Sequence, residues 1–218
     1  SGWFAGIFLG SIVVPHILAR VGHVRVFGAM AAIASATVLI HIIFLNPTIW
    51  TVMRFASGFS FAGMYIVCES WLNEKATNEN RGQLLSLYTI VNMGGMGAGQ
   101  LMVSLDHSTG SGLFLLASVM VSIAVVPILI TASPAPSFEA PERISFRRLI
   151  QVSPLAVIGM TMIGVVISMV FGMGAVYGRA IGLDNTQIGY FITSVTLGTL
   201  ALQYPIGRPQ PARRDLPS

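Results

Sequence analysis

The chain has 218 residues, of which 54% are hydrophobic and only 9% charged, with a mean hydropathy of +0.76 and a net charge of +4. A soluble domain is about 25% charged, so this composition excludes an ordinary soluble fold and indicates helices that have lipid as their solvent. The basic balance does not indicate nucleic acid binding, because the twelve lysines and arginines form no dense stripe and no recognition motif. The lone cysteine, Cys68, excludes an intrachain disulfide.

Seven apolar segments follow one another along the chain, each of about the length that a bilayer core of about 30 Å requires. They are residues 2–18, 26–45, 48–71, 84–105, 113–131, 154–177 and 187–206. Short polar or turn-rich separators lie between them. The sequence therefore predicts an all-α, polytopic bundle of seven transmembrane helices.

The longest separator, residues 133–153, carries three prolines and five charged residues and divides five apolar segments from two. We interpret it as a linker between two bundles, the first in residues 1–132 and the second beginning in residues 154–206. Residues 207–218 hold three prolines and three arginines, so we expect a disordered tail there. The first apolar run starts near Ser1 with no charged region ahead of it, unlike a signal peptide, so we expect a fragment of a longer chain.

Lysine and arginine are distributed unevenly between the two ends of the apolar segments. One set of alternate loops, together with the tail, holds ten of them: Arg20, Arg25, Lys75, Arg81, Arg143, Arg147, Arg148, Arg208, Arg213 and Arg214. The other set of loops holds only Arg179. Because positive charge concentrates in cytoplasmic loops, we expect the first set of loops, the linker and the tail to be cytoplasmic.

The third apolar segment carries the residues that are most indicative of function. Five of them recur at helical spacing on one face: Arg54, Gly58, Phe61, Tyr65 and Glu69. A charge within an apolar helix is costly in lipid and usually faces a bundle interior or an aqueous cavity. We therefore expect Arg54 and Tyr65 to face a cavity and Gly58 to serve helix packing. The alternative is that Arg54 and Glu69 lie near the helix ends and reach the headgroups.

The fourth apolar segment combines glycines with uncharged polar residues. One stripe of it consists of Tyr88, Asn92, Gly95 and Gly99. Small residues four apart let helices approach closely, so we expect Gly95 and Gly99 to serve helix packing. Asn92 and Gln100 either hydrogen-bond a neighbouring helix or face the cavity, where both are candidates for contact with a solute.

Residues 69–82 are dense in charges of both signs. They form either a solvated loop or a cytoplasmic gate of salt bridges and helix-end contacts, in which Glu69, Glu74 and Arg81 are the candidates. No metal-ligand spacing, phosphate-binding loop or nucleophile elbow occurs along the chain. We therefore expect a protein that moves something rather than an enzyme, with no metal ion and no cofactor.

Residues 15–25, Pro-His-Ile-Leu-Ala-Arg-Val-Gly-His-Val-Arg, resemble the signature loop between helices 2 and 3 of the major facilitator superfamily of transporters. Arg20, Gly22 and Arg25 match the signature, whereas a proline and an alanine replace its first glycine and its aspartate. The resemblance implies that these three matching residues form or support a cytoplasmic gate.

Three further stretches carry the same resemblance. Arg54 with Gly58 is similar to the helix 4 pattern of the family, and residues 69–82 are similar to its YcaD-like bacterial branch. Residues 205–208 resemble the start of the repeated signature between helices 8 and 9. The resemblance implies that the seven segments are helices 2 to 8 of twelve, with residues 133–153 as the central cytoplasmic loop.

The family resemblance implies secondary active transport of a small solute by alternating access, coupled to a gradient of protons or another ion, in a bacterial inner membrane. The expected partners are therefore the lipid bilayer, the solute and the coupling ion. Residues that would face the cavity are Arg54, Tyr65, Asn92 and Gln100. Residues that would build the gate are Arg20, Gly22, Arg25, Glu69, Glu74 and Arg81. The alternatives are a non-transporting membrane protein, such as a sensor or scaffold, and an inactive truncated gene product.

Overall fold

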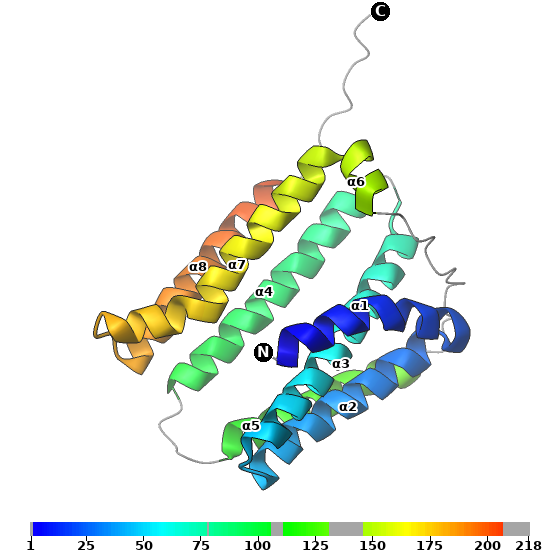
Figure 1. Ribbon diagram of the computed structural model, residues 1–218. Coiled ribbons are helices and arrows are strands. Elements are labelled where there is room, and N and C mark those ends of the chain that lie inside the picture. The colour runs from blue at the N-terminus through cyan, green and yellow to red at the C-terminus, as the bar shows by residue number, and fades with distance from the viewer. Residues whose placement is uncertain (1, 78, 106–110, 131–145, 207–218) are drawn as a thin grey trace, which may run out of the picture. The chain divides into compact units, whose positions relative to one another are not determined.

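The computed structural model of the chain describes residues 2–77, 79–105, 111–130 and 146–206, and within these ranges every regular element is a helix (Figure 1). The helices are α1 (Gly2–Val21), α2 (His23–Ile43), α3 (Pro47–Lys75), α4 (Arg81–Leu105), α5 (Gly112–Ile130), α6 (Phe146–Val152), α7 (Pro154–Ala180) and α8 (Asn185–Ile206). The all-α fold class that the sequence predicts is confirmed. The predicted tail lies outside the described residues.

The seven long helices coincide with the seven predicted apolar segments, and several of them extend further. For example, α3 continues to Lys75 and α7 to Ala180, beyond the predicted ends at residues 71 and 177. The length of an apolar segment measures only the part of a helix that matches the hydrocarbon core. It therefore underestimates the length of a helix whose polar ends extend beyond that core. The short helix α6 was not predicted, because it lies inside the segment interpreted as a linker.

Five helices in the described ranges are long and apolar enough to cross a membrane by length and composition, namely α1, α2, α3, α5 and α7. The other two long helices fall short because their compositions are less apolar. Five glycines lie in α4 and four threonines in α8. Composition alone therefore supports five of the seven predicted spans, while the positions of all seven helices agree with the prediction.

A single residue, Gly22, connects α1 to α2. Its φ of 88° lies in the left-handed region, which favours glycine because a Cβ is strained there. The Gly22 N–H donates to the Leu18 carbonyl at 2.9 Å, and the Gly22 carbonyl accepts from the Val26 N–H at 3.2 Å. One helix therefore ends and the next begins without a loop, and the predicted start of the second helix at residue 26 is corrected to His23.

The α7–α8 connection is also a tight turn around a glycine. Gly182 has a φ of 85°, and the Leu183 N–H returns to the Gly178 carbonyl at 2.9 Å, which satisfies the end of α7. Asp184 and Gln187 then each accept the other's backbone N–H through the side chain, at 2.7 and 2.9 Å. This reciprocal capping box begins α8.

The contacts divide the chain into two units that do not follow chain order. The first unit comprises residues 1–77 and 108–141, which hold α1, α2, α3 and α5. The second unit comprises residues 78–107 and 142–218, which hold α4, α6, α7 and α8. The division predicted from the sequence, at the linker, stays a prediction.

In the first unit, α3 packs against both α1 and α2, and α5 packs against α2. The core cluster consists of Val14, Leu18, Val26, Met30 and Val67. Glycines bring α1 and α3 close together, because a Cβ at any of several α1 glycines would overlap the α3 backbone; at Gly6 it would overlap the Phe55 carbonyl. Small residues of this kind are what allow helices to pack closely in lipid.

Hydroxyl groups also join the helices of the first unit. The Ser35 hydroxyl of α2 lies 2.6 Å from that of Ser118 and 3.0 Å from that of Ser122, both in α5. The Thr37 hydroxyl of α2 lies 2.7 Å from the Ser57 hydroxyl of α3. Both sets of contacts fix the rotation of α2 against its neighbours.

In the second unit, α8 packs against α4 and α7, and α6 contacts α7. Figure 1 shows α7 and α8 running side by side. The buried residues of α8 include Ile188, Ile192, Thr193 and Thr196. Most of α7 is exposed, and its buried residues in the described structure are Gly174 and Gly178.

Candidate functional site

The polar stripe predicted on α3 divides into two parts in the structure. Arg54, Tyr65 and Glu69 are exposed, and Tyr65 is 40% accessible. Gly58 and Phe61 instead contact α1: a Cβ at Gly58 would overlap a carbonyl of that helix, and the Phe61 ring lies 5.3 Å from a tryptophan ring of it. The predicted packing role of Gly58 therefore agrees with its surroundings.

The exposed residues share their face of α3 with Gly58 and Phe61, which contact α1 between Arg54 and Tyr65. Residues of α3 that face its neighbours are buried, and they are mostly small: Ser57, Gly58, Ser60, Ala62, Gly63 and Val67. Arg54, Tyr65 and Glu69 lie within roughly 60° of one another around the helix axis. They span about 22 Å along that axis, at about 1.5 Å per residue. They are therefore spread along the helix, with the α1 contacts of Gly58 and Phe61 between Arg54 and Tyr65, rather than gathered in one compact site.

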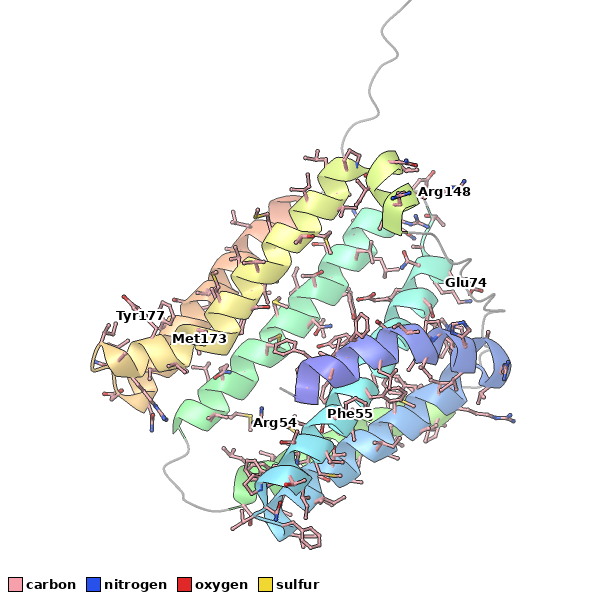
Figure 2. All side chains as sticks on the ribbon, viewed as in Figure 1. Arg54, Phe55, Glu74, Arg148, Met173 and Tyr177 are labelled. Carbon is pink, nitrogen blue, oxygen red and sulfur yellow. The ribbon has the colours of Figure 1, made fainter. Side chains whose placement is uncertain are left out.

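Figure 2 shows Arg54 and Glu74 well separated along α3. Both side chains are exposed. The exposed residues thus begin in the first half of α3 and continue toward the charged end that the sequence assigns to the cytoplasm. We name the exposed residues Arg54, Tyr65 and Glu69 the α3 track.

The turn at Gly22 and the charged end of α3 meet through a histidine that sequence reasoning did not single out. His23 is fully buried, and its Nε2 lies 2.7 Å from the Ser70 hydroxyl. The Ser70 hydroxyl also lies 3.2 Å from the Val67 carbonyl, and which of Nε2 and the hydroxyl is the donor depends on the tautomer of His23. The His23 ring also packs 5.8 Å from the ring of Trp71.

This contact brings together two segments that the sequence predicts to be parts of a gate. Arg20 and Arg25 flank the turn and are exposed, as is Glu74 near the end of α3. The histidine directly follows Gly22, whose left-handed conformation allows α2 to begin at His23. The His23 ring contacts α3 through Ser70 and Trp71. A histidine directly after a turn glycine was the available signal, but its partner lies 47 residues away, and the sequence does not indicate that pairing.

The remaining predicted residues lie in the second unit. Asn92 and Gln100 are half-buried in α4, and Arg81 is exposed at the start of the same helix. Gly95 and Gly99 are exposed, with nothing in the described structure within 4 Å of a Cβ built on either. At Gly97, α4 faces α8, and a Cβ added there would be at ordinary contact distance, 3.5 Å, from Cγ2 of Thr196.

The structure shows the α8 contact at Gly97, which was not predicted, and packing at Gly95 and Gly99 stays a prediction. The cavity roles of Asn92 and Gln100 and the gate role of Arg81 also stay predictions.

A family model described as the Major Facilitator Superfamily matches residues 1–213. The chain is 25% identical over 210 residues to the uncharacterized MFS-type transporter YcaD of Escherichia fergusonii. It is 27% identical over 212 residues to the protein of the same name from Salmonella arizonae. Each match covers 95% of this chain and 55% of the relative, so the chain spans about half the length of these curated relatives. No solved structure matches the chain significantly.

Proposed function

The chain belongs to the Major Facilitator Superfamily, and we propose that it forms part of a secondary active transporter that moves a small solute by alternating access. It is an integral, multi-pass membrane protein. Its relatives are named MFS-type transporters, which favours transport over the sensor and scaffold alternatives. The proposed localisation is the bacterial inner membrane, with transport coupled to a gradient of protons or another ion.

The α3 track is the observation that supports this proposal most strongly. An arginine, a tyrosine and a glutamate are exposed on one side of a helix that is otherwise apolar enough to cross a membrane. Ionisable groups at membrane depth are expensive unless water or a polar partner solvates them. An aqueous pathway beside α3 would satisfy this requirement at each of the three exposed residues.

The turn at Gly22 supports a gate at the cytoplasmic end. The bond between His23 and Ser70 fixes the turn against the end of α3, so Arg20 and Arg25 are held near that end. We assign these two arginines, with Gly22, Glu69 and Glu74, to the part of the gate that the first unit supplies, and the gate role of Arg81 stays a prediction. The proposal leaves the solute unassigned, because the track combines both charge signs with an aromatic hydroxyl.

The test of the proposal is uptake by the complete gene product in which this chain occurs. Everted membrane vesicles would be energised with a proton gradient, and its dissipation would be followed with a pH-sensitive dye as amino acids, sugars and cationic dyes are added in turn. We expect one class to dissipate the gradient, and the variant Arg54→Ala to abolish that response while membrane insertion is unchanged.

A matched control for Arg54→Ala is Arg179→Ala, which removes a cation from the last turn of α7. This control should retain the response. If Arg54→Ala retains the full response, the assignment of the α3 track to the pathway is wrong.

A further inference from the structure

The short helix α6 has two chemically different sides. At about 100° per residue, Arg147, Arg148 and Gln151 fall within an arc of roughly 100°. The opposite arc holds only apolar residues, which include Leu149, Ile150 and Val152. All six side chains are exposed.

The described part of the chain covers the apolar side of α6 only in part. Leu149 is 43% exposed, Ile150 is 42% exposed and Val152 is 76% exposed. Contact of these three side chains with water would be unfavourable, because each Å² of exposed apolar surface costs about 25 cal/mol. This side of α6 therefore needs a partner.

The position of α6 indicates what that partner is. One residue, Ser153, separates it from α7, which begins with Pro154 at its first turn and is apolar enough to cross a membrane. The Ser153 N–H donates to the Leu149 carbonyl at 3.0 Å, so α6 ends directly where α7 begins. Figure 1 shows α6 beside the first turns of α7 rather than in line with it. We expect a helix joined this closely to a membrane span to lie at the depth of the headgroups.

The charge of α6 indicates which lipids it contacts. It carries two arginines and no acidic residue, and Figure 2 marks Arg148 on it. The set of loops to which α6 belongs, together with the tail, holds ten of the eleven loop and tail cations. We therefore expect α6 to be on the cytoplasmic side. The cytoplasmic leaflet has a negative surface potential from its anionic lipids.

We propose that α6 lies on the cytoplasmic surface of the membrane and binds anionic phospholipid headgroups. Leu149, Ile150 and Val152 enter the boundary between headgroups and acyl chains, and Arg147 and Arg148 contact the phosphates. The surface thereby holds the start of α7 at a fixed depth. This inference rests on the expected orientation of the chain and is independent of the transported solute.

The experiment measures the depth of each side of α6 in the whole chain. In a Cys68→Ser background, a single cysteine replaces either Val152 on the apolar side or Gln151 on the polar side and carries a nitroxide label. The protein is reconstituted in vesicles of phosphatidylcholine, with or without phosphatidylglycerol. With phosphatidylglycerol, we expect the label at position 152 to collide with oxygen and to be protected from a water-soluble nickel chelate, and the label at 151 to show the reverse.

The arginines are tested by their effect on the equilibrium between α6 bound to the membrane surface (docked) and α6 released from it (undocked). The two components of the nitroxide spectrum report the two populations. Each of Arg147→Gln and Arg148→Gln should weaken docking about fivefold in vesicles with phosphatidylglycerol. The variant Arg148→Lys keeps the charge and should retain docking. The control Arg179→Gln, at the other end of α7, should leave the equilibrium unchanged.

Three results would overturn the proposal. If both labels are fully accessible to the nickel chelate, α6 does not lie on the membrane. If the label at 152 is protected from oxygen as well as from nickel, protein rather than lipid covers it. If phosphatidylglycerol has no effect, the contact is apolar only and the headgroup assignment is wrong.

Discussion

Two long helices, α3 of the first unit and α7 of the second, differ in how much of their most apolar stretch is buried. In α3, 33% of the most apolar stretch is buried inside the protein. In α7, 0% of the most apolar stretch is buried. Yet α7 is the more apolar of the two helices. The buried side of α3 consists mostly of glycine, alanine and serine. In a membrane protein, therefore, strong apolarity marks exposure to lipid, and small residues mark the contacts between helices.

This comparison predicts opposite effects of the same substitution in the two units, and these effects should be the largest. Gly6→Ala in α1 places a methyl group on the Phe55 carbonyl, so we expect it to destabilise the first unit by about 1–3 kcal/mol or more. Gly95→Ala in α4 meets open space, so we expect it to be neutral or to stabilise by up to about 1 kcal/mol through helix propensity.

Unfolding midpoints in mixed detergents containing increasing sodium dodecyl sulfate would measure both variants. Equal losses at Gly6 and Gly95 would show that α4 also packs through its predicted stripe. No loss at Gly6 would show that α1 and α3 are further apart than the structure has them.

A smaller effect is expected at the turn that joins α1, α2 and α3. Ser70→Ala removes the partner of Nε2 of the fully buried His23, which should destabilise the first unit by about 1–3 kcal/mol. The matched control is Ser11→Ala, because the Ser11 hydroxyl is exposed and donates only to the Phe8 carbonyl of its own helix. A difference of less than about 0.5 kcal/mol between the two variants would contradict the contact, since exposed substitutions have effects of that size.

The serine contacts between α2 and α5 should contribute less. Ser35→Ala removes hydroxyl contacts to both Ser118 and Ser122, and interhelical hydrogen bonds in lipid average about 0.6 kcal/mol. We expect a loss of about 1 kcal/mol in the same unfolding assay. The control Ser194→Ala removes a bond to a carbonyl three residues away in α8 and should have no effect. Equal losses from both variants would exclude a specific link between α2 and α5.

The smallest effect is expected inside the second unit. The Thr193 hydroxyl is buried and has no hydrogen-bond partner within the described structure, so Thr193→Val should be neutral or slightly stabilising. The Thr196 hydroxyl donates to the Ile192 carbonyl at 3.2 Å, so Thr196→Val should lose about 0.5–1.5 kcal/mol. A larger loss at Thr193 than at Thr196 would reveal a partner for the Thr193 hydroxyl.

The sequence predicts the long helices well because the length of an apolar run is a local property. It predicts the ends less well, since Gly22 starts α2 three residues before the apolar run and α3 continues past it to Lys75. It misses α6, which has seven residues and is too short for an apolar run to reveal.

The candidate site is predicted in part for a related reason. Helical spacing places Arg54, Tyr65 and Glu69 on one face, and these three side chains are exposed, although Gly58 and Phe61 on the same face contact α1. The contact of His23 with Ser70 joins residues 47 positions apart, which periodicity does not indicate. Similarly, a pair of glycines four residues apart shows that a helix can approach closely but does not identify its neighbour, and the contact of α4 with α8 lies at Gly97 instead.

The most direct test of the central claim is the accessibility of the α3 track to water. In a Cys68→Ser background, Tyr65→Cys places a thiol on the track and Val67→Cys places one at similar depth in the buried core. A membrane-impermeant maleimide would be added to right-side-out and inside-out vesicles of the complete gene product. We predict that the thiol at position 65 is labelled from at least one side, and that the thiol at 67 is labelled only after denaturation. A thiol at 65 that resists labelling from both sides until denaturation would contradict an aqueous pathway along α3.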